Sequence, residues 1–532
     1  MHKLVLKYTF VLLAIALVGC AKRGSITGGI KDTLAPRITS SLPKNFTTNF
    51  KGNEIKIYFD EYVKLKNANK QLIISPPLKR FPEILPYSAS KFITIKIKDT
   101  LQENTTYSFN FGSSIEDNNE GNALLQYKYV FSTGNYIDSL QMNVKFKDAL
   151  EKKLDKFVSI MLYEVDEKYT DSLVYKQAPR YITNTLDSLK IVKLENLKPG
   201  KYQLLALKDE NGNNKFDPKT DKIGFQKDII TVPNDTLYEV ELFKEAQPFK
   251  AVNVSQASGS RITMGYEGNA KDVKIAIKKD NENLAYSVSK VADKDSLNIW
   301  FKGIKGDSLT IDVSKDKFNK TFSLKVKDQK KDTLNISSLQ TGNLKFRDKY
   351  TLKSSTPIVK YDVSKIKIIT KDSTDVKFTL SYKELEQHLV FDFEKQPLEK
   401  YSLTALPSAF TDYYNKENDT IKYKFTTANT SDYGNLRLKL ENVKRFPVLI
   451  QLTNKDGKIL ASATSEKETD INFDLIEPAL FTLRLIYDDN KNGIWDAGNF
   501  LEKRQSEEVI YFPKEIDVRA NWDVEQPFDV GK

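Results

Sequence analysis

The sequence predicts an all-β protein built from tandem β-sandwich domains, and three observations support this fold class. Stretches such as "NEIKIYFDEYV", "KFITIKIKD" and "TYSFNF" alternate apolar and polar residues with period two. Clusters of Asn, Asp, Gly and Pro separate them, as expected for half-buried antiparallel strands joined by turns. The chain has 532 residues, enough for about five sandwiches of roughly 100 residues each.

Alternation continues to the end of the chain, whereas helical patterns are scarce. "KDVKIAIKK", "DSLTIDVSK", "TIKYKFTT" and "FTLRLIYD" repeat the strand pattern. The stretch "SYKELEQHL" is predicted to supply one helical turn. The single cysteine, Cys20, excludes intramolecular disulfides, so stability must come from apolar cores.

The N-terminus has the pattern of an export signal. Lys3 and Lys7 precede an apolar segment from Thr9 to Val18, about half the length that a bilayer-spanning helix needs. Leu17, Val18, Gly19 and Cys20 resemble the lipobox of bacterial lipoproteins, which implies that the cysteine is acylated, palmitate included, and becomes the new N-terminus. The alternative is an ordinary signal peptide with an incidental cysteine. Residues 1–19 are therefore predicted to be a lipoprotein signal peptide, and residues 20–34 the lipidated cysteine and a flexible tether.

Internal repeats set the domain boundaries. "LQENTTYSFNFGSSIEDNNEGNALLQYKYVFSTGN" is echoed by "LEKYSLTALPSAFTDYYNKENDTIKYKFTTAN", and "LKPGKYQLLALKDENGNNKFD" by "IEPALFTLRLIYDDNKNGIWD". The chain is thus predicted to contain two copies of a two-domain module around a central β-rich segment. The expected domains are 35–134, 135–245, 246–342, 343–429 and 430–532.

The first domain resembles a known family. "PRITSSLPKN", "IKIYFDEYV", "TYSFNFGSSIEDNNEGN" and "YVFST" are similar to the SbsA-type bacterial Ig-like domain of envelope and surface-layer proteins. The whole chain resembles tandem Ig-like envelope lipoproteins of Bacteroidota. The segments 135–245 and 430–532 resemble transthyretin-like or carboxypeptidase-regulatory-like sandwiches. These resemblances imply architecture rather than chemistry.

Two Asp/Asn-rich loops are the best candidates for a metal site. Alternate oxygen ligands around a tight turn suit Ca²⁺, and Asn214 or Gly493 at the sixth position can adopt the left-handed conformation that such a turn needs. The candidate ligands are Asp209, Asn211, Asn213, the Lys215 carbonyl, Asp217 and Asp221 in one loop, and Asp488, Asn490, Asn492, the Ile494 carbonyl and Asp496 in the other. Neither loop has a Glu at position 12; Glu502 comes three residues after that position in the second loop. The alternative is a hairpin tip held by Asx-turns without metal, so no cofactor is required.

A recurrent tripeptide, Asp followed by Ser or Thr and then Leu or Ile, matches the O-glycosylation signal of Bacteroidota envelope proteins. The candidate acceptors are Thr33, Thr100, Ser139, Ser172, Ser188, Thr236, Ser296, Ser308, Thr333 and Thr420. The alternative is turn chemistry, because Asp with Ser or Thr initiates turns and the following Leu begins a strand.

Catalytic signals are weak. The chain has two histidines, His2 in the signal segment and His388, so a Ser-His-Asp arrangement or a His-rich zinc site is not expected. Carboxylates such as Asp60 with Glu61, or Asp117 with Glu120, could form a hydrolase pair, but acids at strand ends are usually solvated. A net charge of +11, spread without a basic block, predicts no nucleic-acid binding.

These observations favour a non-enzymatic envelope lipoprotein in which tandem sandwiches serve as a spacer or scaffold for a protein or glycan partner. Ala21 is not an inner-membrane retention aspartate and no acidic export cluster follows, so an outer-membrane anchor facing the periplasm is favoured over the cell surface. One alternative is a surface adhesin that binds polysaccharide, which an exposed Trp495 would support. Another is a carboxylate-based hydrolase with two close acids in a cleft.

Overall fold

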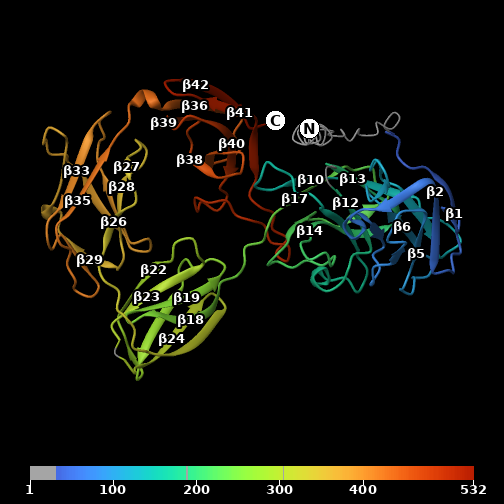
Figure 1. Ribbon diagram of the computed structural model, residues 1–532, viewed down its shortest axis with the longest axis horizontal. Coiled ribbons are helices and arrows are strands. Elements are labelled where there is room, and N and C mark those ends of the chain that lie inside the picture. Colours follow the sequence, from blue (N-terminus) through green and yellow to red (C-terminus); the bar gives the residue numbers. More distant parts are fainter. Residues whose placement is uncertain (1–31, 187–189, 304, 532) are drawn as a thin grey trace, which may run out of the picture. The chain divides into compact units, whose positions relative to one another are not determined.

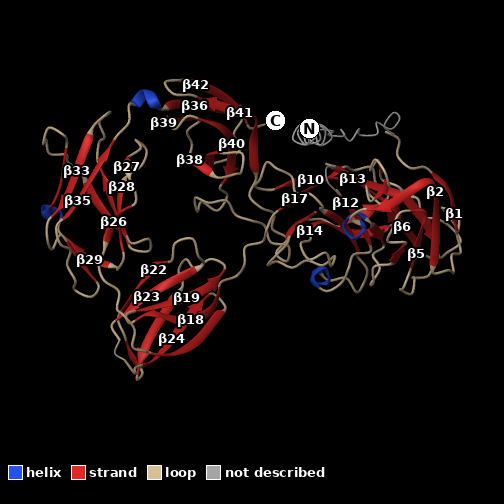
Figure 2. Ribbon diagram, viewed as in Figure 1, coloured by secondary structure: helices blue, strands red, loops and turns tan. Residues whose placement is uncertain are grey.

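A computed structural model describes residues 32–186, 190–303 and 305–531 of the chain. Figure 2 shows that these residues form mostly strands, with a few short helices, so the predicted all-β fold is confirmed. They divide into two compact units, one of residues up to Ser139 with Asn196–Lys198, the other of Leu140–Glu195 and the chain from Pro199 onward. In the described part of the chain, no helix has both the length and the apolar character needed to cross a membrane.

The first unit contains one β-sandwich, the first sandwich (Figure 1). One sheet has the order β4-β5-β2-β7-β8 with β1 on β2, and the other the order β3-β6-β9. Its elements are β1 (Ile38–Leu42), β2 (Glu54–Leu65), α2 (Ala68–Gln71), β3 (Ile73–Ser75), β4 (Glu83–Leu85), β5 (Ser90–Lys96), β6 (Thr106–Asn110), β7 (Ile115–Asp117), β8 (Ala123–Leu124) and β9 (Lys128–Ser132). Alternation along β2 buries Ile55, Ile57 and Phe59 in the core, as period-two patterning requires.

The second unit begins with the second sandwich. Strand β10 lies between β13 and β17 in one sheet, and the other sheet has the order β12-β11-β14-β15 with β16 on β14. Its elements are β10 (Leu140–Asp148), β11 (Ser159–Glu164), η1 (Asp171–Tyr175), β12 (Tyr181–Asn184), β13 (Ile191–Leu197), β14 (Gly200–Lys208), β15 (Lys222–Phe225), β16 (Ile230–Val232) and β17 (Tyr238–Leu242).

The third sandwich packs the four-stranded sheet β18-β19-β23-β22 on the four-stranded sheet β21-β20-β24-β25. Its strands are β18 (Lys250–Ser258), β19 (Arg261–Glu267), β20 (Lys274–Lys279), β21 (Glu282–Asn283), β22 (Tyr286–Lys290), β23 (Ser296–Phe301), β24 (Ser308–Lys315) and β25 (Phe318–Lys325). Trp300 is fully buried although it does not belong to the core cluster, and its indole N–H donates to Ser289 Oγ at 2.8 Å, which satisfies its polar group.

The fourth sandwich has the sheets β26-β28-β32-β31 and β27-β35-β33-β30, with the pair β29-β34. Its elements are β26 (Ile336–Ser338), β27 (Gly342–Asn343), β28 (Tyr350–Ser354), β29 (Ile358–Tyr361), η2 (Val363–Lys365), β30 (Ile366–Ile369), β31 (Thr379–Lys383), β32 (His388–Asp392), β33 (Lys400–Ala405), β34 (Phe410–Asp412) and β35 (Ile421–Thr426). The helical turn predicted in "SYKELEQHL" is wrong: Lys383 pairs with His388 in a β-hairpin whose turn places Gln387 at a φ of 57°. Pairing with the sheet overrides the local helical preference of Glu and Leu.

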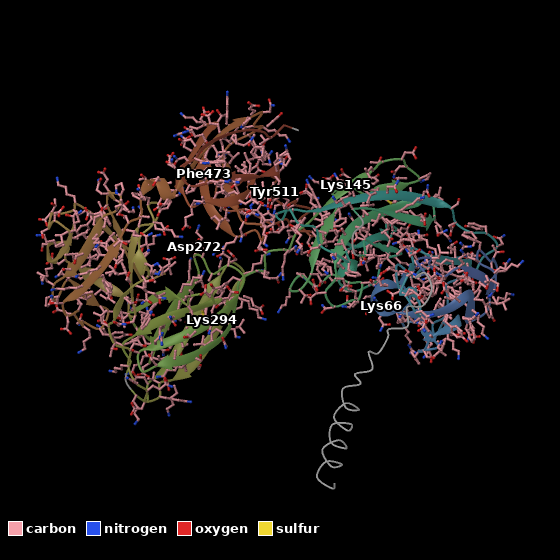
Figure 3. All side chains as sticks on the ribbon, turned by 45° about the horizontal axis from the view of Figure 1, so that its top comes forward. Lys66, Lys145, Asp272, Lys294, Phe473 and Tyr511 are labelled. Atoms are coloured by element: carbon pink, nitrogen blue, oxygen red, sulfur yellow. The ribbon has the colours of Figure 1, made fainter. Side chains whose placement is uncertain are left out.

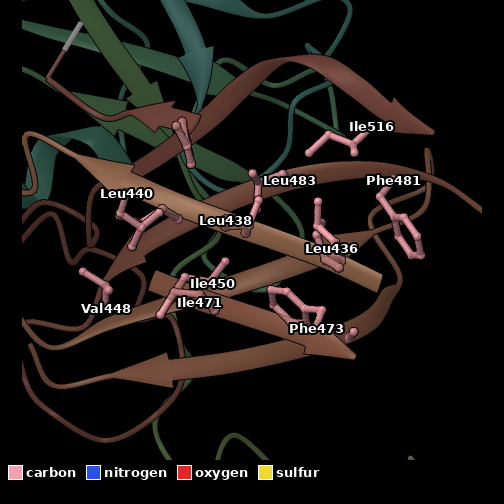
Figure 4. Packing of buried hydrophobic residues seen from close by; sticks show 14 of the residues in the cluster. Leu436, Leu438, Leu440, Val448, Ile450, Ile471, Phe473, Phe481, Leu483 and Ile516 are labelled. Carbon is pink, nitrogen blue, oxygen red and sulfur yellow. The ribbon is translucent and has the colours of Figure 1, made fainter. Parts of the chain in front are cut away.

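The fifth sandwich has the same topology as the second. Its elements are η3 (Thr430–Asp432), β36 (Gly434–Glu441), β37 (Val448–Thr453), β38 (Ile459–Ser465), β39 (Asp470–Ile476), β40 (Ala479–Tyr487), β41 (Val509–Val518) and β42 (Asp523–Asp529). β36 pairs in parallel with β42, as β10 does with β17. Figure 4 shows the apolar core between its sheets, where Leu436, Leu438 and Phe473 of one sheet pack with Leu483 of the other.

The repeat predicted between the first and fourth sandwiches extends to individual hydrogen bonds. The hydroxyl of Tyr107 accepts from the Gln102 N–H at 2.9 Å, and the hydroxyl of Tyr401 accepts from the Gln396 N–H at 2.7 Å. The two tyrosine rings stack on corresponding Phe rings, each at a centroid distance of 5.4 Å. The sequence echo therefore reflects two sandwiches closed in the same way.

Candidate functional site

The predicted lipidation site lies outside the described residues. Cys20 and its lipobox residues Leu17, Val18 and Gly19 precede residue 32, where the description begins. Ser188, one of the predicted glycosylation acceptors, is also outside it. These predictions are taken up again below as proposals.

The first Asp/Asn loop joins β14 to β15 in the second sandwich. The Asp209 carboxylate accepts from the backbone N–H groups of Gly212 at 2.7 Å and Asn214 at 2.6 Å. Asn214 has a φ of 57°, the left-handed conformation expected at the sixth position. Asn213 Oδ1 accepts from the Lys215 N–H at 2.8 Å. The loop is thus closed by Asx-turn hydrogen bonds.

The second loop follows β40 in the fifth sandwich and is closed in the same way. The Asp488 carboxylate accepts from the N–H groups of Asn492 at 3.0 Å and Gly493 at 2.9 Å, and Gly493 has a φ of 79°. The side-chain amides of Asn490 and Asn492 both donate to Asp496, at 2.5 and 2.7 Å. The two loops therefore share the contact of the first Asp with the sixth residue, whereas their side-chain amides differ, since Asn211 donates to Thr220 Oγ1 at 3.1 Å.

A buried acid anchors each loop, and only one of them is evident from the sequence. Asp221 is fully buried and accepts from the N–H groups of Glu210 and Asp217 at 3.1 and 2.8 Å. In the fifth sandwich Glu507 takes this place, accepting from the N–H groups of Asp489 and Asp496 at 2.9 and 3.0 Å. Sequence reasoning missed Glu507, because it follows Asp496 at a much larger distance than Asp221 follows Asp217.

These contacts engage carboxylates that a metal ion in either loop would need. Among the described residues, no group of three or more His, Cys, Asp or Glu side chains is placed to hold a metal ion. Asn490 and Asn492 present N–H groups rather than oxygens to Asp496, and Ca²⁺ takes oxygen ligands. Calcium binding would require several of these hydrogen bonds to be exchanged.

The acids of the first sandwich hold a turn. Asp117 is buried and its carboxylate accepts from the N–H groups of Glu120, Gly121 and Asn122 at 2.6, 3.1 and 2.7 Å. Burial alone raises the pKa of Asp117, but the backbone donors outweigh it and lower the pKa to about 2. Burial and the neighbouring carboxylates, Asp117 first, raise the pKa of Glu61. Asp117 is thus a structural acceptor that closes the turn before β8.

His388 lies on β32 opposite Lys383 and Lys353 of the adjacent strands. Burial lowers the pKa of His388, and the charge of Lys353 lowers it further. Glu386 is the acid that opposes this shift. The surroundings of His388 are therefore mainly cationic.

The predicted glycosylation acceptors in the described residues lie at the starts of strands or in the connections between elements, except Ser172 in η1. Those that are exposed are Thr33, Thr100, Ser139, Ser172, Thr236, Ser308, Thr333 and Thr420. Ser296 is half-buried at the first position of β23. This placement agrees with both interpretations of the tripeptide, since turn residues and modified residues must each reach the surface.

Two features bear on ligand binding. Trp495 is half-buried and its indole N–H donates to the Glu507 carbonyl at 3.1 Å, so it is not the exposed ring that the adhesin hypothesis needs. Exposed aromatics occur instead on the first sandwich, where Tyr62 is 57% and Tyr87 88% exposed.

A groove of about 350 Å³ lies inside the second unit. Its lining includes Glu151 and Lys152 of the second sandwich and Tyr511 and Glu515 of the fifth. Lysines accompany the two acids, among them Lys153 and Lys455. The groove is therefore of mixed charge and not a site lined by acids alone.

The comparison with family models concerns the first sandwich. Residues 32–133 match the family model described as the bacterial Ig-like domain. This match confirms that the first sandwich resembles a bacterial Ig-like domain. A search of curated proteins found no match.

Solved structures similar to this chain include the surface layer protein SbsC, domains 1–6, at 12% identity, with 91% of this chain and 67% of that chain covered and a TM-score of 0.16. The major pilin subunit of Bacillus cereus shares 12% identity over 74% of this chain and 99% of its own, with a TM-score of 0.14. The native alpha-2-macroglobulin from Escherichia coli, spanning domains MG0-NIE-MG1, shares 12% identity over 51% of this chain and 97% of its own, with a TM-score of 0.18. At such TM-scores these likenesses carry no argument about function.

Proposed function

We propose that the chain is a non-enzymatic, lipid-anchored protein of the cell envelope, whose β-sandwiches form a scaffold for a protein or glycan partner. The observation that carries this proposal is the combination of an N-terminal leader ending at Cys20 with a chain of separate sandwich cores, the first of which matches the bacterial Ig-like domain. A Bacteroidota-type lipoprotein is the kind of envelope protein that this combination resembles.

The anchor is proposed to be an acylated Cys20 in the outer membrane, with the sandwiches on the periplasmic side. Several acyl chains hold a protein far more firmly than one, because each buried methylene contributes about 0.8 kcal/mol. Metabolic labelling with an alkyne analogue of palmitate tests the anchor. We expect label on the parent chain and none on Cys20→Ser; equal label on both would refute it.

A scaffold role is supported by what the conspicuous acids do. Asp117, Asp209, Asp221 and Asp488 each accept backbone N–H groups and hold turns. Carboxylates engaged in this way are structural acceptors, as the scaffold proposal requires. Glycosylation at the exposed Asp-Ser/Thr-Leu/Ile positions is part of the same proposal, since it suits a chain displayed in the envelope.

A surface protein that binds polysaccharide is the second candidate, and one observation favours it. On the first sandwich Tyr62 and Tyr87 are exposed, Phe92 is 41% exposed, and the Lys91 ammonium lies 5.7 Å from the centroid of the Tyr62 ring. Exposed aromatic rings offer faces on which sugar rings can stack. Tyr62→Ala with Tyr87→Ala would weaken retention on a polysaccharide column if this candidate is right.

Protease accessibility distinguishes the two candidates. An epitope-tagged chain would be treated with protease on intact cells and on cells whose outer membrane has been opened. Protection until the membrane is opened supports the periplasmic scaffold. Digestion on intact cells refutes the periplasmic placement and supports the surface-exposed candidate.

A further inference from the structure

The fifth sandwich carries an insertion that the second lacks, at an equivalent place in the fold. Asp217 and Asp221 are separated by three residues, whereas their counterparts Asp496 and Glu507 are separated by ten. In each pair the backbone N–H of the first acid donates to the carboxylate of the second. The additional residues therefore form an insertion between two equivalent positions. We name Ala497–Gln505 the docking turn.

The tip of the docking turn is buried against the second sandwich. Phe500 is 0% exposed, and its ring meets the edge of the Phe225 ring at a centroid distance of 5.2 Å. The Phe500 N–H donates to the buried Glu245 carboxylate at 2.6 Å. Gly498 permits this approach, since a Cβ there would lie 2.4 Å from the Phe243 ring. Phe500 therefore occupies an apolar site on another sandwich and not a place in its own core.

Polar contacts surround the Phe500 site. The Lys503 ammonium lies 2.7 Å from the Asp171 carboxylate and 3.1 Å from Gln203 Oε1. It also lies 4.2 Å from the centroid of the Phe500 ring, within the range of a cation–π contact. Gln505 Nε2 donates to the Phe225 carbonyl at 2.9 Å. An apolar anchor surrounded by hydrogen bonds is the arrangement of a specific interface.

A second group of contacts joins the same two sandwiches. Arg484 is 4% exposed and donates to the Leu150 carbonyl at 3.0 Å, and the Tyr511 hydroxyl donates to the same carbonyl. The Lys152 ammonium donates to the carbonyls of Phe512 and Pro513, each at 3.3 Å. Figure 3 labels Tyr511 on the fifth sandwich. The interface thus extends well beyond the docking turn.

Consecutive sandwiches of this unit also contact one another. Lys219 pairs with Glu267 between the second and third sandwiches. The Tyr414 hydroxyl donates to the Ser260 carbonyl between the third and fourth. Lys345 pairs with Glu477 between the fourth and fifth. Since the fifth sandwich returns to the second, the contacts of the unit form a closed circuit.

We propose that the docking turn is an intramolecular clasp, which holds the second and fifth sandwiches together and closes sandwiches two to five into a ring of contacts. The partner for the Phe500 site is thus a segment of the same chain. Because the third and fourth sandwiches tether the two partners, the local concentration of the docking turn is about millimolar or higher. The unit behaves as a closed scaffold and not as an extendable spacer, an inference that does not depend on the proposed envelope function.

Distance measurement by double electron–electron resonance tests the clasp in the full chain. Spin labels would be placed at Glu167→Cys and Lys467→Cys, both exposed, with Cys20→Ser so that no other thiol reacts. We expect one narrow distance distribution in this labelled parent. Phe500→Ala with Lys503→Ala should broaden the distribution and extend it to longer distances. Leu501→Ala is the matched control, because Leu501 lies in the same turn but is 57% exposed, and it should retain the narrow distribution.

A charge exchange separates loss of the clasp from loss of folding. Asp171→Lys should open the clasp by placing two cations together, and Asp171→Lys with Lys503→Asp should restore the narrow distribution. Light scattering on the labelled parent should give a monomer. Any of four results would overturn the proposal. The labelled parent could give a broad distribution, or Phe500→Ala with Lys503→Ala could leave the distribution unchanged. The charge exchange could fail to restore the narrow distribution, or the parent could be a dimer in which the docking turn binds a second copy.

Discussion

The two copies of the two-sandwich module share several internal hydrogen bonds and differ in the segment that follows the Asp/Asn loop. In the first copy the loop after Asp217 is short and ends at Asp221; in the second the corresponding segment is extended by the docking turn and ends at Glu507. The acceptor role of the buried acid is retained although its residue type and its position in the sequence change. The comparison teaches that the hydrogen bonds to the buried acid maintain the loop. The segment before that acid can change in length and sequence, and can therefore form a new contact.

The prediction with the largest expected effect removes the buried acid, Asp221 or Glu507, from each loop in turn. Asp221→Ala and Glu507→Ala each remove the acceptor for two backbone N–H groups, and we expect each to lower the free energy of unfolding of its own sandwich by about 2–4 kcal/mol. Hydrogen exchange measured by mass spectrometry resolves the sandwiches within the full chain. Glu210→Ala, at an exposed position of the same loop, is the control. If Glu507→Ala left exchange in the fifth sandwich unchanged, the equivalence of the two acids would be wrong.

A smaller effect tests the first and fourth sandwiches. Tyr107→Phe and Tyr401→Phe remove the hydroxyl that accepts from Gln102 and Gln396, and each should cost about 1 kcal/mol. Both changes retain the ring and its stacking on Phe, so the loss should be nearly equal in the two sandwiches. The same exchange measurement checks it. Losses that differ several-fold would show that the repeated hydrogen bonds do not carry repeated energies.

The features of the fold and of the loops that could be predicted from the sequence are those that depend on local sequence patterns. Strand alternation and the echo of Tyr107 by Tyr401 are local patterns, and they predicted the fold class and the repeat. The left-handed residues Asn214 and Gly493 were likewise evident from their place in the turns. The helical turn near Glu384 was predicted wrongly, because local propensity carries no information on sheet pairing.

The interface of the docking turn was beyond such reasoning. Phe500 and Glu245 are 255 positions apart, and neither belongs to a recurring pattern. An apolar residue in a mostly polar loop is interpreted as an ordinary exposed residue until the surface that covers it is known. A useful signal was nevertheless present in the sequence. The loop of the fifth sandwich is longer than that of the second, and its additional residues include Phe500, Lys503 and Arg504.

A pH dependence distinguishes the first sandwich. Asp117 has a pKa of about 2 in the folded chain against an ordinary value of 3.8, so the folded state binds this proton less tightly than the unfolded state. Its contribution to stability is therefore present above about pH 3.8 and is lost as the pH falls through about 2. Protection factors in residues 32–139, which are exchange rates corrected for the intrinsic rate at each pH, should fall over this range. Asp117→Asn should reduce the acid-dependent part of the change; an identical profile in the variant would contradict the assignment.

The smallest expected effect concerns calcium, and it tests whether the two Asp/Asn loops are alike in chemistry as well as in shape. Asp209 already accepts three backbone N–H groups and Asp488 two, so a bound cation would have to displace contacts that hold the turn. We expect the thermal unfolding midpoint to be the same in EDTA and in about 10 mM Ca²⁺, roughly ten times the dissociation constant of weak extracellular sites. Mg²⁺ at the same concentration controls for ionic strength. A calcium-specific rise that is abolished by Asp209→Asn or by Asp488→Asn would assign a metal to that loop, and a rise abolished by only one of them would show that the copies have diverged in chemistry too.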